Sequence, residues 1–270
     1  MVCFFRHQLA LILSYLAIIH ASFEPYELNG GLVSAVSGKG FSIIASDTRM
    51  IGEGGYLLNS RNHLSCRLWS VNDIASMNDV EDILRDNSKA KVINPLRTHE
   101  APLMIGSAGC SADCAALQRA LRADLRVASY LGQTTSSQPE KVATMLSQIL
   151  YLRRGFPYYS FCVISGMDEN GFGRAYVYDA IGSYEQVAVA TAGTGRETLQ
   201  PILDRLFECV SESKQVEGTA DEAVKTLYEA YLSVSEREIG VGDRLVLLVS
   251  EKSSEGLFDC RTIVLPLKQH

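Results

Sequence analysis

The sequence predicts an α+β fold in which two mainly antiparallel β-sheets pack together and helices cover their outer faces. Short apolar, β-branched runs and amphipathic helices follow one another in the order strands, two helices, strands, two helices, strands. The connections between neighbouring strands are short, which favours antiparallel pairing because parallel pairs need long crossovers. A chain of 270 residues can bury a substantial core, so we expect one domain.

The first predicted strands form a hairpin. Leu32–Ser37 and Phe41–Ser46 are apolar and β-branched, and Gly38-Lys39-Gly40 makes the turn between them. Residues 70–100, by contrast, are polar and show no sustained periodicity. We therefore expect a solvated insertion there, with one short helix near 79–86. The other predicted strands are Tyr56–Asn59, Ser65–Trp69, Ala101–Gly106, Tyr159–Ser165, Arg174–Asp179, Gln186–Ala192, Arg244–Ser250 and Cys260–Leu265.

Four helices are predicted from apolar residues that recur every three or four positions. The first begins at Ser111 and the second at Pro139, because proline suits the first turn of a helix. The fourth begins with Thr219-Ala-Asp-Glu222, the pattern of a capping box. The inward stripes are, in chain order, Leu117, Leu121, Leu125 and Ala128; Val142, Met145, Leu146, Ile149 and Leu150; Leu199, Ile202, Leu203 and Leu206; and Val224, Leu227, Tyr228 and Tyr231.

Composition limits the classes of partner and cofactor. A net charge of -6 and a pI near 5.4 argue against nucleic acid or an anionic membrane as the main partner. The seven cysteines are scattered, odd in number and without a Cys-x-x-Cys pair, as in a cytosolic protein with reduced thiols. Cys110 and Cys114 lie four positions apart, but no histidine or second pair completes a zinc set. We expect no metal and no cofactor.

The N-terminal segment allows two interpretations. Arg6 precedes the apolar run Leu9–Ile19, and the small residues Ala21 and Ser22 follow, which resembles a secretory signal peptide. The run is too short to span a bilayer. A signal peptide would carry several unpaired thiols into an oxidising compartment, so we favour a leader or pro-segment over residues 1–27, followed by one domain over 28–267. The alternative is a secreted or vesicular hydrolase-like protein.

Several separated motifs then identify a family. They are Asn29-Gly30-Gly31, Ile44-Ala-Ser-Asp47-Thr-Arg49, Leu150-Tyr-Leu-Arg-Arg-Gly-Phe-Pro-Tyr-Tyr159, Ile164-Ser-Gly-Met-Asp-Glu-Asn-Gly171 and Tyr178-Asp-Ala-Ile-Gly-Ser-Tyr184. In these motifs the chain resembles the proteasome β-subunit family, over residues 23–267 apart from the 70–100 insertion. The resemblance implies the four-layer αββα sandwich of the N-terminal-nucleophile hydrolases, which agrees with the predicted order of elements.

The resemblance also implies where a catalytic site would lie. Active members attack with the hydroxyl of an N-terminal Thr, use its free α-amine as the base, and rely on a nearby Lys and Asp. A Gly-Ser-Gly turn supplies backbone donors near the oxyanion. On this sequence the nucleophile position falls on Gly31, the Lys position on Ser65 and the Asp position on Asp47, with Arg49 beside it. The turn matches Gly193-Thr194-Gly195, and the later Asp-x-x-Ser-Gly segment matches Glu238-Ile239-Gly240-Val241-Gly242.

Glycine has no side chain and cannot act as an oxygen nucleophile, so we expect no catalytic residue at Gly31. Asp47, Arg49, Thr194 and Glu238 would be remnants of the family site. A simpler interpretation of Asp47 and Arg49 is a buried ion pair or a turn anchor. The turn at Thr194 either begins a helix or binds an anion.

The function implied is that of a non-catalytic, structural β-subunit of the 20S proteasome core. It would complete the β-ring of a twenty-eight-subunit hetero-oligomer in which active neighbours cleave proteins. Its partners would be other β-subunits and the α-subunits, with neither nucleic acid nor membrane. The implied location is the cytoplasm and the nucleus, whereas the apolar run Leu9–Ile19 would favour secretion.

Overall fold

The computed structural model describes residues 26–52, 66–71, 91–132, 138–207 and 214–267. Some features expected from the sequence fall outside these ranges: the apolar run Leu9–Ile19, the strand Tyr56–Asn59, Ser65 and the helix near 79–86.

Two antiparallel sheets form the centre of the fold, as predicted. The first has six strands in the order β4-β11-β10-β2-β1-β9, and the second has five in the order β3-β5-β6-β7-β8. The strands of the first sheet are β1 Leu32–Ser37, β2 Phe41–Asp47, β4 Lys91–Thr98, β9 Val189–Gly193, β10 Arg244–Lys252 and β11 Phe258–Pro266. Those of the second are β3 Leu68–Ser70, β5 Leu103–Gly109, β6 Ser160–Met167, β7 Gly173–Tyr178 and β8 Tyr184–Val187.

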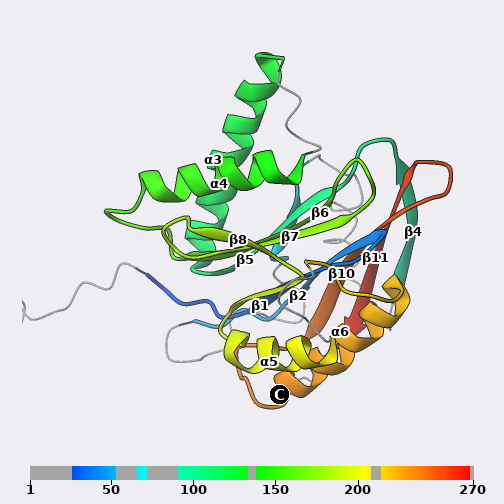
Figure 1. The fold of residues 1–270 in the computed structure, drawn as a ribbon. Helices are drawn as coiled ribbons and strands as arrows, with labels where there is room; N and C mark the ends of the chain where they lie inside the picture. The colour runs from blue at the N-terminus through cyan, green and yellow to red at the C-terminus, as the bar shows by residue number, and fades with distance from the viewer. Residues whose placement is uncertain (1–25, 53–65, 72–90, 133–137, 208–213, 268–270) are drawn as a thin grey trace, which may run out of the picture.

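Helices cover the outer face of each sheet (Figure 1). The helices α3 (Ser111–Tyr130) and α4 (Pro139–Leu152) pack on the five-stranded sheet. The helices α5 (Arg196–Leu206) and α6 (Ala220–Ser235) pack on the six-stranded sheet. A separate hydrophobic cluster fills the space between the two sheets. No helix in the described ranges is long and apolar enough to cross a bilayer.

The strand β1 is buried along its whole length because both of its faces are covered. Successive side chains of a strand point to opposite faces. Leu32 and Val36 therefore pack under α5 and α6, while Val33 and Ala35 lie between the sheets. This position places the start of β1, and hence Gly31, at the edge of a fully packed core.

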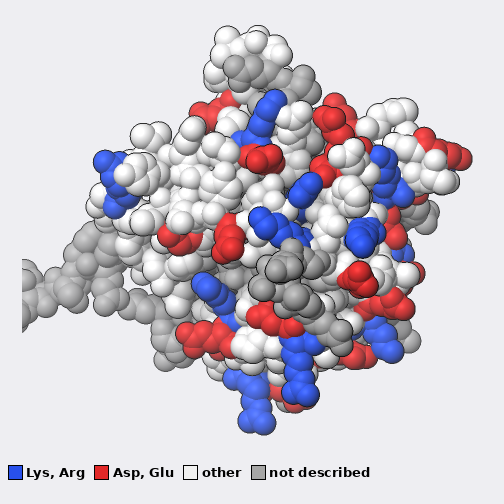
Figure 2. Space-filling view, in the orientation of Figure 1, with Lys and Arg blue, Asp and Glu red and all other residues white. Residues whose placement is uncertain are grey.

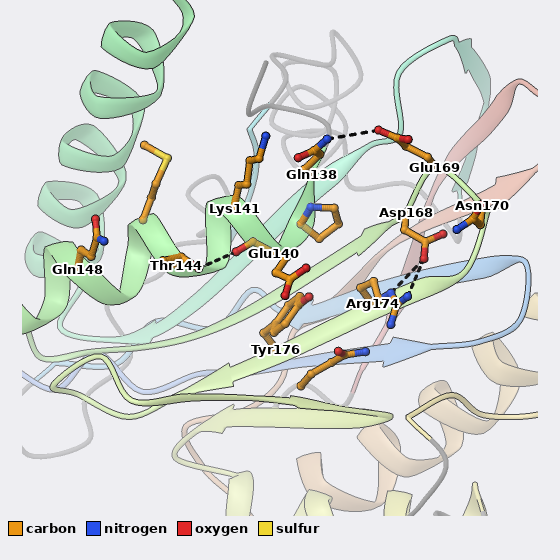
Figure 3. A pocket seen from close by; sticks show the side chains of 13 residues that line it. Gln138, Glu140, Lys141, Thr144, Gln148, Asp168, Glu169, Asn170, Arg174 and Tyr176 are labelled. Atoms are coloured by element: carbon orange, nitrogen blue, oxygen red, sulfur yellow. Dashed lines mark hydrogen bonds and ion pairs between the residues drawn. The ribbon is translucent and has the colours of Figure 1, made fainter. Parts of the chain in front are cut away.

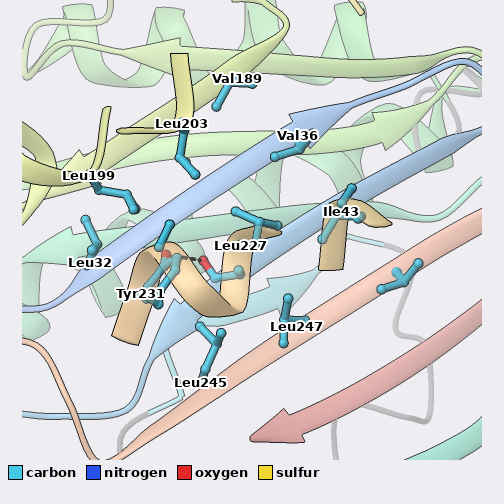
Figure 4. Packing of buried hydrophobic residues seen from close by; sticks show 14 of the residues in the cluster. Leu32, Val36, Ile43, Val189, Leu199, Leu203, Leu227, Tyr231, Leu245 and Leu247 are labelled. Atoms are coloured by element: carbon cyan, nitrogen blue, oxygen red, sulfur yellow. Dashed lines mark hydrogen bonds between the residues drawn. The ribbon is translucent and has the colours of Figure 1, made fainter. Parts of the chain in front are cut away.

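Tyr231 of α6 anchors the helix to the sheet beneath it (Figure 4). Its hydroxyl donates toward Ser34 Oγ at 3.0 Å and the Ala45 carbonyl at 3.3 Å, which joins α6 to β1 and β2. Burial raises the pKa of the phenol far above its usual value, so the hydroxyl remains a donor. The aromatic ring packs beside Leu227 in the same cluster.

The four predicted helices within the described ranges form, but not every side chain predicted to face inward is buried. The predicted stripe of α3 is buried throughout, and the Thr219–Glu222 capping box is present at the start of α6. In α5, Leu199 and Leu203 are buried, but Leu206, predicted to face inward, is exposed.

The expected insertion over 70–100 is wrong for residues 91–98. These residues form β4, which pairs with β11 at the end of the six-stranded sheet. An edge strand can carry charges and proline because one of its sides needs no partner. Pro95 lies where the register shifts, Val92 is 65% exposed, and Arg97 Nε pairs with Asp259 Oδ1 at 3.0 Å. Residues 91–98 are polar because they form the edge strand of a sheet, not because they form a loop.

Candidate functional site

The site begins where the chain enters β1. Gly30 and Gly31 have φ angles of +67° and +95°, in the left-handed region that favours glycine. The Gly31 nitrogen donates to the Gly240 carbonyl at 3.1 Å. Its carbonyl accepts from the Thr194 backbone N–H at 3.0 Å and from Thr194 Oγ1 at 3.3 Å. The structure therefore brings together Gly31, the Thr194 turn and the loop after Glu238.

Asp47 lies at the end of β2 and is fully buried beside this entry. Its Oδ1 accepts from the Leu32 N–H at 2.8 Å, and its Oδ2 accepts from the Arg49 and Gly242 N–H groups, each at 3.2 Å. Burial raises the pKa of Asp47 to about 6, although the Arg67 charge and the three hydrogen bonds act in the opposite direction. The carboxylate thus holds the start of β1 against the loop before β10.

Arg67, which the sequence patterns did not single out, is also part of this site. Its side chain is buried just before β3, and its Nε lies 3.4 Å from Asp47 Oδ1. Its Nη2 donates to the Asn29 carbonyl at 3.3 Å and also to the Arg49 carbonyl. A Cβ built on Gly31 would overlap the Arg67 guanidinium. The guanidinium therefore fills the space that a side chain at position 31 would need.

A signal for Arg67 was present in the sequence. The predicted strand Ser65–Trp69 is short. Arg67 is its one basic residue, and its other residues are apolar or small. A charged residue in a strand that is buried must be paired. The assignment of the Lys position to Ser65 lies outside the described residues, so its position in the site is still a prediction.

Arg49 has a different partner. Its guanidinium is fully buried, with Nη2 3.1 Å from Asp243 Oδ1 and Nη1 donating to the Ile239 and Val241 carbonyls at 3.1 and 3.4 Å. Asp243 itself has a φ of +65°, so Arg49 holds a strained loop. The Asp47 carboxylate therefore forms its ion pair with Arg67, and the Arg49 guanidinium forms its ion pair with Asp243. Arg49 contacts Asp47 through its backbone N–H.

Glu238 has a local role in the same loop. Its Oε1 accepts from the Gly240 N–H at 3.2 Å, which stabilises the turn whose carbonyl bonds to Gly31. Thr194 precedes α5, whose N-cap Gly195 makes no side-chain capping bond. A cavity of about 310 Å³ adjoins this turn and is lined in part by Leu28, Tyr159 and Arg196.

A larger, polar depression of about 870 Å³ lies elsewhere, over the start of α4 and the β6–β7 turn (Figure 3). Arg174 Nη2 pairs with Asp168 Oδ2 at 2.8 Å on one side, and Gln138 Nε2 donates to Glu169 Oε1 at 3.4 Å across it. The depression shares no lining residue with the surroundings of Gly31. Within the described ranges, no group of three or more histidine, cysteine, aspartate or glutamate residues could hold a metal ion.

Two antiparallel sheets with helices on their outer faces are the fold of the N-terminal-nucleophile hydrolases. The chain belongs to the proteasome subunit family, whose model, described as "Proteasome subunit", matches residues 79–249. It is 31% identical to Proteasome subunit beta type-1-B of Carassius auratus over 257 residues, covering 94% of this chain and 92% of that protein. It is 32% identical to Proteasome subunit beta type-1 of Arabidopsis thaliana over 236 residues, covering 85% and 91%. It is 29% identical to Probable proteasome subunit beta type-6 of Schizosaccharomyces pombe over 262 residues, covering 92% and 98%.

Proposed function

We propose that this chain is a non-catalytic β-subunit of the 20S proteasome core. The observation that carries the proposal is the entry to β1, where Gly31 has no side chain and the Arg67 guanidinium occupies the adjoining space. Relatives named proteasome subunit beta type-1 match over most of the chain, which supports a place in the β-ring.

The proposed inactivity follows from the chemistry of acyl transfer. That reaction needs a nucleophile and a base within hydrogen-bond reach of each other. Gly31 supplies no hydroxyl, and its nitrogen is a backbone amide that donates to Gly240. A neighbouring hydroxyl in the described part of the chain, Thr194 Oγ1, is directed at the Gly31 carbonyl. Asp47, Arg49, Thr194 and Glu238 are then structural residues.

The proposal extends to assembly and location. The chain would form the four-layer αββα sandwich of its class and take its place in a hetero-oligomer of β- and α-subunits, in the cytoplasm and the nucleus. On the face that Figure 2 shows, acidic and basic side chains are interspersed, so that face presents no continuous basic surface of the kind that nucleic acid binds. Residues 1–27 would form a leader or pro-segment ahead of the domain over 28–267.

Native mass spectrometry of the assembly purified through this chain tests the proposal. We expect a multi-subunit particle that contains α- and β-type partners. A threonine-directed covalent inhibitor should label other chains of the particle, which serve as the positive control, and leave this chain unlabelled. An adduct on this chain, or a free monomer released by secretion, would contradict the proposal. The mature N-terminus read from the same spectra would test the leader.

A further inference from the structure

We propose that Asp47 and the carbonyls of Asn29 and Arg49 form a guanidinium-binding cradle, which Arg67 occupies from within the chain. The cradle joins the segments before β1, after β2 and before β3. It also closes the space beside Gly31 to any other group. The inference rests on contacts within one chain and holds whether or not the chain assembles into a proteasome.

Arg67 meets the acceptors around it by an ion pair and by two hydrogen bonds from Nη2, while its buried Nε makes no hydrogen bond. Its Nε faces the Asp47 carboxylate at 3.4 Å, while Nη2 donates to the carbonyls of Asn29 and Arg49. A planar guanidinium can point donors in several fixed directions, which a lysine ammonium cannot reproduce. Arg67 is only 6% exposed, so these contacts replace the water that the cation would otherwise bind.

Asp47 depends on this cation for its charge balance. Among the described residues, Arg67 is the one cation paired with the Asp47 carboxylate. The other buried arginine nearby, Arg49, directs its guanidinium to Asp243 and to loop carbonyls. Removing the Arg67 guanidinium would therefore leave a buried carboxylate with only backbone donors, which is strongly unfavourable.

Gly31 and Arg67 depend on each other. A Cβ at position 31 would overlap the Arg67 guanidinium, and the φ of +95° is a second obstacle to any side chain there. Restoring a hydroxyl at position 31 alone would expel the guanidinium and leave Asp47 unpaired. The site is thus closed by two linked residues, and a single substitution should not reopen it.

A double-mutant cycle on the purified full-length chain separates overlap from backbone strain. Gly40 is the matched control, because it has a φ of +88° and no atom within 4 Å of an added Cβ. We expect Gly31→Ala to lower the folding equilibrium constant at least about tenfold more than Gly40→Ala does. In the Arg67→Ala background this excess should disappear. The proposal would be overturned if Gly31→Ala and Gly40→Ala lowered the folding equilibrium constant equally. It would also be overturned if the effects of Gly31→Ala and Arg67→Ala were fully additive.

Rescue by a free cation tests the cradle directly. Millimolar methylguanidinium should raise the melting temperature of Arg67→Ala, with tetramethylammonium at the same ionic strength as the salt control. It should not raise that of the wild type or of Arg174→Ala, whose partner Asp168 lies in a partly exposed pair. No difference among the three chains would refute a guanidinium site.

A milder variant covers the case in which Arg67→Ala does not fold. Arg67→Lys keeps the charge but carries its donors on one nitrogen rather than on a planar guanidinium, so it should fold with reduced stability and still show part of the coupling to Gly31→Ala. Stability unchanged by Arg67→Lys would contradict a planar cradle. These measurements report on folding, so their failure is distinguishable from labelling of the chain by a threonine-directed inhibitor, which tests the proposed function.

Discussion

Replacing Asp47 by asparagine isolates the free energy that this buried carboxylate contributes at each pH. Folding raises its pKa from 3.8 to about 6, because burial outweighs the Arg67 charge and the backbone donors. Between these two values the folded chain binds more protons than the unfolded chain, so stability falls as pH rises. The contribution is fully favourable below about pH 4 and is lost as pH rises through about 6.

The size of the effect follows from the pKa difference. The change from 3.8 to about 6 corresponds to a loss on the order of 3 kcal/mol between pH 4 and pH 7. Hydrogen bonds with Thr219 lower the pKa of Glu222, which acts in the opposite direction, so the quantity to compare is the free energy of unfolding of the wild type minus that of Asp47→Asn. This difference should decrease by about 3 kcal/mol over that range.

Urea denaturation of both chains at intervals from pH 4 to pH 8 measures the difference. The Asp47 side-chain carboxyl carbon in the NMR spectrum of the wild type should titrate with a midpoint near 6. In Arg67→Lys chains the midpoint should stay close to this value, whereas in Arg67→Met it should rise, because the compensating charge is gone. A difference that grows with pH between 4 and 6 would show that hydrogen bonding and charge outweigh burial, and the reasoning would fail.

Three further substitutions test other contacts by chemical denaturation. Tyr231→Phe should cost about 1 kcal/mol, because its hydroxyl bonds in the core, and more than Tyr228→Phe, whose hydroxyl bond to a carbonyl is exposed. Asn29→Ala should cost about 1–3 kcal/mol, because its buried amide joins the loop at Ile51 to the first turn of α3. Thr219→Ala should cost about 1 kcal/mol through loss of the capping box, and a value near zero would count against that cap.

The spacing of apolar residues along the chain predicted the strands and helices whose burial depends on that spacing alone. The Leu32–Ser37 hairpin strand and the buried stripe of α3 follow from the spacing of apolar residues. In α6, the predicted Leu227 and Tyr231 are buried, and Val224 and Tyr228 pack partly buried against the same cluster. The sequence missed the buried Ala223 and Ala230, because alanine is a weak hydrophobic signal. Small residues on that face let the helix approach the sheet.

Long-range pairings were the ones that the sequence did not reveal. The strand β4 exists because β11, far along the chain, offers it hydrogen bonds, and nothing in residues 91–98 alone shows that partner. In the site, the sequence offered no means to assign Asp47 and Arg49 to their charge partners. Arg67 and Asp243 are distant from them in sequence, and only the packing of the sheets brings each pair together.

The arrangement at Gly31 also bears on how the entry to β1 stays packed where the chain has no side chain. A glycine at this position would leave a gap, and the buried Asp47 would lack a countercharge; each of these alone would destabilise the core. One guanidinium addresses both problems, since it occupies the gap and pairs with the carboxylate. A buried Asp47 needs no catalytic explanation, because its three backbone hydrogen bonds hold β1, Arg49 and the loop before β10 in register.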